Sequence, residues 1–305
     1  MRSPRLPPGH LLELPSGRTT FARIDGPPDA PAVLLLHGWA VTADLNWYGM
    51  YDQLPDLRLL APDHPGHGRA ARLRHSGRFT LRRAADDAVG VLDVAGVDRA
   101  IVVGYSMGGA VAQLVARHHP SRVAGVVLCA TACRFSSRAV ATSAGALTLG
   151  AALHRRLPPR AALRAFSAVA RHRTARWGLT GWPAQEVQRG DATSILEAMA
   201  ELARFDSRRW LSSVTVPSSV VVTTADTLVT PARQRELVAH RPGASVFEVD
   251  GDHVVCTAAP ELFGPVLRRA VDAVAVASSR GEGGPGGATG ARRRTASGRP
   301  GRPRP

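Results

Sequence analysis

The chain is 305 residues long, with 44% hydrophobic and 21% charged residues, a composition typical of a globular protein with a sizeable buried core. This composition excludes a chain that is disordered throughout, a collagen and a coiled coil. The formal net charge is +15 and every one of the 39 basic residues is Arg, so partners that carry negative charge have to be considered.

The positive charge is concentrated in two regions. Residues 278–305 hold seven Arg and one acidic residue, and residues 131–215 hold 13 Arg and five acidic residues; the rest of the chain has 19 Arg against 18 acidic residues. The stretch 278–305 has no apolar residue larger than Ala, so it predicts a disordered tail rather than a DNA-binding domain. We expect no specific nucleic-acid partner, while non-specific contacts of the tail with anionic polymers or lipids stay open.

Cysteine content and hydropathy predict a cytoplasmic protein without a membrane span. Cys129, Cys133 and Cys256 have neither disulfide nor metal-knuckle spacing, and we expect small buried residues rather than catalytic thiols. The basic start of the chain is followed by no apolar segment of a signal peptide, and no run of 18 apolar residues exists.

Short apolar runs alternate with helix-length segments along most of the chain. Strands are predicted at 32–37, 57–62, 100–104, 123–129, 219–224 and 245–249. Helices are predicted at 80–95, 107–118 and 261–277. This alternation predicts an α/β fold with a mainly parallel central sheet flanked by helices.

The alternation stops between 131 and 215. This segment is rich in Ala and Arg and has helical periodicity without a convincing strand. We interpret it as a helical cap inserted into an α/β core made of residues 1–130 and 216–277, with residues 278–305 as the tail. Packing helices without a functional role are the alternative interpretation.

The sequence Gly-Tyr-Ser-Met-Gly at 104–108 matches the pattern G-x-S-x-G. A predicted strand runs directly into it and a predicted helix begins directly after it, which is the context that this pattern requires of a nucleophile. Ser106 would occupy a strained turn between them, and the flanking glycines avoid clashes with the adjacent strand and helix. A glycine-rich turn without chemistry is the alternative.

Together with three further landmarks, this pattern resembles the α/β-hydrolase superfamily over about residues 18–277. The landmarks are His-Gly-Trp at 37–39, Asp-His-Pro-Gly-His-Gly at 63–68, and an Asp and a His after the last two strands. The resemblance is to the branch of serine esterases, lipases and cofactor-free haloperoxidases with a helical cap. It implies the α/β-hydrolase fold, and it implies that His64 and His67 are structural rather than catalytic.

His253 is the candidate base, because it is the one histidine just beyond the last predicted strand. A serine hydroxyl needs such a base to become nucleophilic at neutral pH. The family usually has Gly before this histidine, whereas this chain has Asp252, a departure that could alter the loop or the pKa of the imidazole.

Asp226 is the candidate acid that orients the imidazole. It follows the strand predicted at 219–224, at the position that matches the family's usual acid, and the strand at 123–129 is followed by no acid. Asp250 and Asp252 lie too close along the chain to the histidine to be the usual partner, but they stay open as alternatives. The chain order Ser106, Asp226, His253 is the one expected for this fold.

The resemblance also implies an oxyanion hole formed by backbone N–H groups. One donor would be the amide of Met107, the residue after the nucleophile, and the other the amide of Trp39. The side chain of Trp39 could also form a wall of the acyl pocket.

These residues predict a serine hydrolase that cleaves an ester or related acyl bond of a small-molecule substrate through an acyl-enzyme intermediate. No metal-binding or phosphate-binding motif is present, so no cofactor and no metal are implied. Peroxidase-like chemistry through a peracid and carbon–carbon bond hydrolysis use the same three residues and stay open. So do a non-catalytic ligand-binding relative and a protein that binds anionic polymers through its Arg-rich segments.

Overall fold

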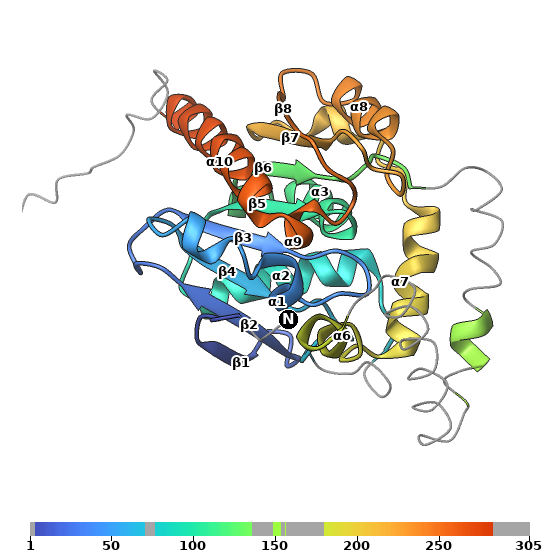
Figure 1. The fold of residues 1–305 in the computed structure, drawn as a ribbon. Coiled ribbons are helices and arrows are strands. Elements are labelled where there is room, and N and C mark those ends of the chain that lie inside the picture. The colour runs from blue at the N-terminus through green and yellow to red at the C-terminus, as the bar shows by residue number, and fades with distance from the viewer. Residues whose placement is uncertain (1–3, 71–76, 136–148, 154–155, 157–179, 283–305) are drawn as a thin grey trace, which may run out of the picture.

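The computed structural model describes residues 4–70, 77–135, 149–153, 156 and 180–282. A single eight-stranded sheet crosses this part of the molecule, with the strand order β1-β2-β4-β3-β5-β6-β7-β8 (Figure 1). The strands are β1 (Gly9–Glu13), β2 (Thr19–Asp25), β3 (Ala32–Leu36), β4 (Arg58–Pro62), β5 (Ala100–Tyr105), β6 (Val123–Cys129), β7 (Ser218–Thr223) and β8 (Ser245–Val249). From β4 to β8 in the strand order all neighbours are parallel, whereas the pairs β1–β2 and β2–β4 are antiparallel, so the mainly parallel sheet is confirmed.

Continuous apolar runs form the inner strands because both faces of the sheet are buried. In β3, Leu34 and Leu36 contribute to the core on one face, whereas Val33 and Leu35 contribute to the core on the other. All four side chains are fully buried. Because successive side chains of a strand point to opposite faces of the sheet, one apolar run contributes to both cores.

Helices cover both faces of the sheet. The first core includes residues of α2 (Leu81–Val94), α3 (Met107–His118) and α8 (Pro231–Ala239). The second includes residues of α1 (Ala43–Trp47), α9 (Val255–Ala258) and α10 (Pro260–Glu282). Because β3 to β8 run parallel, their carboxyl ends lie at one edge of the sheet, where ligands of open α/β sheets bind.

Two features differ from the expectations. The sequence did not predict β1 and β2, in which polar and exposed residues interrupt the apolar pattern. The closing helix α10 continues to Glu282, past the boundary expected at 277. Residues 283–305, and with them the predicted disorder of the tail, lie outside the described residues.

The chain between β6 and β7 adds helices and no further strand of the sheet in the part that the structure describes. It forms α6 (Trp182–Val187), α7 (Ala192–Arg204) and a 3-10 turn at Leu211–Ser213. Asp191 caps α7 by accepting a hydrogen bond from the amide of Ser194 at 3.0 Å. The parts of the expected cap at 136–148, 154–155 and 157–179 lie outside the described residues.

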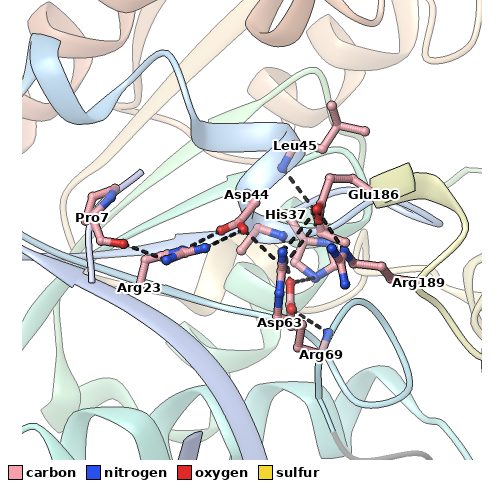
Figure 2. Close-up of polar contacts among 11 residues, drawn as sticks. Pro7, Arg23, His37, Asp44, Leu45, Asp63, Arg69, Glu186 and Arg189 are labelled. Atoms are coloured by element: carbon pink, nitrogen blue, oxygen red, sulfur yellow. Dashed lines mark hydrogen bonds and ion pairs between the residues drawn. The ribbon is translucent and has the colours of Figure 1, made fainter. Parts of the chain in front are cut away.

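An ion-pair network connects α6 to the core (Figure 2). The carboxylate of Glu186, which is fully buried, accepts hydrogen bonds from Thr42 at 2.9 Å, from Arg69 at 3.0 Å and from Arg189 at 2.8 Å. Arg69 also lies 3.0 Å from Asp44. Since a buried carboxylate without cations would be costly, these pairs specify where α6 docks.

Within the described part of the chain, every helix is too short or too polar to span a lipid bilayer.

Candidate active site

Ser106 lies at the turn between β5 and α3, where it adopts φ 53° and ψ −114°. Such a left-handed conformation costs a non-glycine residue about 1–3 kcal/mol, so neighbouring contacts have to maintain it. The amide of Ser106 donates to the carbonyl of Cys129 at 2.9 Å, and the hydroxyl of Thr131 donates to the carbonyl of Ser106 at 2.7 Å. The last residue of β6 and a residue just after it therefore hold the strained peptide from both sides.

The flanking glycines are needed because no space exists for a side chain. A Cβ on Gly104 would lie 2.3 Å from the carbonyl oxygen of Gly108, and a Cβ on Gly108 would lie 2.0 Å from that of Leu36. Both contacts are with backbone atoms, which cannot move without shifting β3 or α3. The clash that the sequence predicts for a side chain is therefore present at both positions.

The structure brings Ser106, Asp226 and His253 together from three loops at the carboxyl edge of the sheet. The Nε2 atom of His253 lies 2.9 Å from the Oγ of Ser106. On the other side of the ring, Nδ1 lies 2.7 Å from Oδ2 of Asp226. Asp250 and Asp252 bond instead to Thr224 and to the amide of Val254, so neither takes the place of Asp226.

The ionisation of Asp226 fixes the tautomer of the histidine. Burial raises the pKa of this carboxyl, but the hydrogen bond and charge of His253, together with donors from Val229 and Thr223, bring the pKa below its usual range. An ionised carboxylate only accepts hydrogen bonds, so Nδ1 of His253 carries a proton and donates it. The Nε2 atom is then free to accept the hydroxyl proton of Ser106.

Asp226 is held by residues that the sequence analysis did not identify. Its Oδ1 accepts hydrogen bonds from the amides of Leu228 and Val229, and its Oδ2 accepts one from the hydroxyl of Thr223 at 2.9 Å. The side chain of Gln234 in α8 donates to that hydroxyl at 2.8 Å. No short-range signal marks Thr223 or Gln234, because their role depends on the loop between β7 and α8 folding back on itself.

The candidate oxyanion donors belong to two segments next to Ser106, the start of α3 and the loop after β3. Met107 is the first residue of α3, where backbone N–H groups lack a partner within the helix. Gly38, in the loop after β3, approaches so closely that a Cβ on it would lie 3.6 Å from the Cβ of Ser106. The next residue, Trp39, donates its indole N–H to the carbonyl of Ile195 in α7 at 2.8 Å. The loop that would supply the second donor is thus bonded to the helical insertion.

The remaining histidines of the motifs are buried behind the site. His37, His64 and His67 have fully buried rings in mutual contact. Desolvation lowers the pKa of His64 to about 3 and that of His67 to about 4, so both are neutral at pH 7. Their contacts, such as that of His64 Nε2 with the carbonyl of His37 at 3.1 Å, support a structural role.

The cysteines near the site are buried and unpaired. Burial raises the pKa of the Cys256 thiol to about 11 and holds that of Cys129 well above its usual value. A protonated thiol is a weak nucleophile, so these two residues act as small packing residues.

A comparison with protein families matches residues 31–259 to the family described as alpha/beta hydrolase fold. The chain belongs to this family. The matched range includes the nucleophile turn, the histidine loop and the insertion between β6 and β7, so the three candidate residues lie within this α/β hydrolase domain.

Curated relatives match about a third of this chain. Epoxide hydrolase B of Mycobacterium tuberculosis is 39% identical over 118 residues, which are 36% of this chain and 32% of that protein. A bifunctional esterase/perhydrolase of Acinetobacter calcoaceticus is 36% identical over 115 residues, 37% of this chain and 41% of that protein. The chain spans about a third to two fifths of the length of these relatives.

Solved structures match over a greater length. The enol-lactonase from Burkholderia xenovorans LB400 superposes with a TM-score of 0.69 at 23% identity, covering 86% of this chain and 100% of the other. At this level of identity the likeness shows the α/β hydrolase fold alone.

Proposed function

We propose that this protein is a serine hydrolase that cleaves a carboxylic ester or a related acyl bond. The observation that carries the proposal is the pair of distances on the two sides of the His253 ring, 2.9 Å to Ser106 and 2.7 Å to Asp226. Adjacent nucleophile, base and orienting acid are the arrangement that activates a neutral hydroxyl.

In the first half of the proposed reaction, Ser106 Oγ attacks the carbonyl carbon while Nε2 of His253 takes the hydroxyl proton. The imidazolium that forms is stabilised by the ionised Asp226. The amides of Met107 and Trp39 donate to the developing oxyanion; loss of one such donor costs about 10²–10³ in kcat. His253 then gives its proton to the leaving alcohol, and the acyl group stays on Ser106.

In the second half, water replaces the alcohol. Nε2 of His253 removes a proton from the water as its oxygen attacks the acyl carbon, and then returns the proton to Ser106 Oγ as the carboxylic acid leaves. The same three residues serve both halves, so the proposal needs no cofactor.

Epoxide opening fits this site less well, although an epoxide hydrolase is among the relatives. The epoxide hydrolases and haloalkane dehalogenases of this superfamily use an aspartate as nucleophile, and this chain has Ser106 at that position. An acyl substrate, whose carbonyl carbon a serine can attack, is the better match.

The segment 131–215 serves in this proposal as a cap that limits which acyl groups reach the nucleophile. Support comes from the bond between the Trp39 indole and Ile195, which joins the cap to the loop beside Ser106. The three unpaired cysteines are consistent with a reducing compartment, so we place the enzyme in the cytoplasm.

Replacement of the nucleophile tests the proposal. We expect Ser106→Ala to lose at least about 10³-fold in kcat/KM on p-nitrophenyl esters, tested over several acyl lengths. A fluorophosphonate probe should label the wild type and not the variant. Unchanged ester hydrolysis by Ser106→Ala would refute the serine mechanism, and absence of labelling in the folded wild type would favour a non-catalytic ligand-binding protein.

Perhydrolysis is a second candidate, favoured by the match to a bifunctional esterase/perhydrolase. In that reaction hydrogen peroxide replaces water in the second half, so the acyl group leaves as a peracid and His253 returns the same proton to Ser106. Adding hydrogen peroxide to the ester assay and measuring peracid separates the two: formation of peracid only with intact Ser106 supports this activity, and its absence leaves simple hydrolysis.

A further inference from the structure

Three side chains of the types that bind transition metals converge beside the start of the helical insertion. Cys133 follows β6, Glu236 lies in α8, and His240 is the residue that ends α8. One candidate ligand atom of each, the thiol sulfur, a carboxylate oxygen and a ring nitrogen, lies within 4.8 Å of the other two. None of these residues takes part in the proposed hydrolytic chemistry.

The helix presents two of the three side chains on one face. Residues four apart in a helix are neighbours on its surface, and the amide of His240 donates to the carbonyl of Glu236 at 3.2 Å, which closes the last turn. Among the described residues, neither ring nitrogen of His240 has a hydrogen-bond partner. The imidazole is therefore available as a ligand without the loss of an existing bond.

The third side chain is held in place by its own backbone. The carbonyl of Cys133 accepts hydrogen bonds from the amide of Ser207 at 2.9 Å and from its hydroxyl at 3.3 Å. The neighbouring residues Arg134 and Asp206 form an isolated β-bridge. Cys133 thus lies where the chain leaves the core and later returns to it. Contacts between residues 133–134 and residues 206–207 hold the two segments together at this point.

The three side chains differ in their access to solvent. Cys133 is fully buried, whereas the side chain of Glu236 is 32% exposed and His240 is half-buried. An ion can therefore arrive from the solvent side and find the sulfur on the inner side. Figure 1 shows α8, which supplies that outer side, next to β7 at one end of the molecule.

We propose that Cys133, Glu236 and His240 bind a divalent transition-metal ion of the zinc class. Sulfur, imidazole nitrogen and carboxylate oxygen together are ligands of Zn²⁺, whereas Mg²⁺ and Ca²⁺ prefer oxygen alone. Three protein ligands leave one tetrahedral position for solvent. On binding, the thiol proton is released to solvent, and the thiolate and carboxylate together balance the charge of the dication.

A nearby arginine is compatible with this site because it has a second partner. Arg208 lies 3.7 Å from Glu236, but its Nε donates to Asp206 at 2.9 Å and Asp206 accepts a further bond from its Nη2. When the Glu236 carboxylate turns to the ion, Arg208 keeps its pair with Asp206. The Arg208 guanidinium is therefore not left without a counter-charge.

The site would link the start of the insertion to α8. The same helix carries Gln234, which supports Asp226 through Thr223. A bound ion would hold the start of the insertion and the end of α8 together. We therefore expect the ion to raise the thermal unfolding midpoint of the full-length protein, as any ligand specific for the folded state does.

The test uses full-length protein freed of metal by a chelator and then titrated with Zn²⁺ or Co²⁺. We expect one equivalent to bind, with a raised Tm, and the Co²⁺ form to show a thiolate-to-cobalt charge-transfer band. Cys133→Ser should abolish the band, and His240→Asn should weaken Zn²⁺ binding at least about tenfold. Because His240 is half-buried, that variant keeps the proposal testable if the cysteine variant fails to fold.

Matched control variants show whether Zn²⁺ binds to side chains other than the three proposed ligands. His10→Asn changes an exposed histidine in β1, Glu248→Gln changes an exposed carboxylate in β8, and Cys256→Ser removes a different thiol. All three should keep the Zn²⁺ affinity and the charge-transfer band. The proposal is overturned if the wild type binds no stoichiometric Zn²⁺. It is also overturned if folded Cys133→Ser and His240→Asn bind Zn²⁺ with the affinity of the wild type, which would show adventitious binding only.

Discussion

At the scale of single residues, the strained turn at Ser106 depends on neighbours that lack a side chain. A Cβ at position 108 would overlap the backbone of Leu36 in β3. We expect Gly108→Ala to destabilise the fold by about 1–3 kcal/mol and to reduce ester hydrolysis sharply, because β3 or the nucleophile has to shift. Denaturant unfolding and kcat measure the two effects.

A glycine in α2 provides the control for this substitution. A Cβ on Gly90 would make ordinary van der Waals contacts at 3.5 Å, and the residue lies within the helix. Gly90→Ala should be neutral or stabilising by up to about 1 kcal/mol, since alanine is the better helix former. Equal losses at both positions would contradict the steric explanation.

The lowered pKa of Asp226 predicts a defined dependence of stability on pH. Its folded-state pKa lies below the usual 3.8, so the ionised carboxylate stabilises the folded state above that pH, and the contribution is lost as pH falls through the folded value. The difference in free energy of unfolding between wild type and Asp226→Asn should be largest near pH 7 and shrink below about pH 4. Denaturant titrations at several pH values measure it; a difference that stays constant into acid would contradict this assignment.

Asp226→Asn should also lower kcat by about 10⁴, because the amide no longer enforces the tautomer that leaves Nε2 free. The stability and kcat effects are independent measurements of one hydrogen bond.

Ser106, Asp226 and His253 could be predicted from the sequence because each follows the carboxyl end of a predicted strand. That position brings them to one edge of the sheet whatever the distance between them along the chain. The roles of Thr223 and Gln234 could not be predicted, since a polar side chain near a strand end can form hydrogen bonds with many different partners. Only the folded loop shows that these two support Asp226.

At the scale of elements, the docking of α6 depends on the charge of Glu186. Glu186→Gln keeps the shape of the side chain but leaves Arg69 and Arg189 short of a counter-charge. We expect a loss of about 1–3 kcal/mol, at the low end because Arg69 retains Asp44 and is partly exposed. Limited proteolysis should show faster cleavage between β6 and β7, and unfolding curves give the energy.

An exposed ion pair is the matched control. Arg235 and Glu248 are each about half exposed, so Glu248→Gln should change stability by less than about 1 kcal/mol. If the buried and the exposed substitutions have the same effect, the network does not determine how α6 docks.

The elements that the sequence predicted are those with a strong apolar pattern. The inner strands and the helices α2, α3 and α10 were found to within a few residues, except that α10 runs further. The strands β1 and β2 were missed because polar residues interrupt their apolar pattern: β1 is a mostly exposed edge strand, and β2 begins with two threonines and ends with Arg23, Ile24 and Asp25. How α6 and α7 contact the core could not be predicted, since it depends on pairs more than a hundred positions apart.

At the scale of the whole molecule, the charge is separable from the proposed chemistry. Residues 283–305 hold six Arg and no acidic residue, and they follow the range 31–259 that matches the α/β hydrolase family and contains Ser106, Asp226 and His253. Deleting this segment should leave kcat/KM on a soluble ester unchanged. It should weaken binding to heparin or DNA and lower the salt dependence of that binding. Lost ester hydrolysis in a folded deletion variant would contradict the separation.

The insertion between β6 and β7 begins and ends at one place. Cys133 and Ser207 are joined by a backbone hydrogen bond of 2.9 Å, although 73 residues lie between them in the chain. Exchanging everything between these two anchors for a different segment would leave both neighbouring strands in register, and closing a longer or shorter loop changes the chain entropy only slowly with its length. In the proposed hydrolase, this hydrogen bond marks a grafting point at which the segment proposed as the cap can be exchanged while Ser106, Asp226 and His253 stay in place.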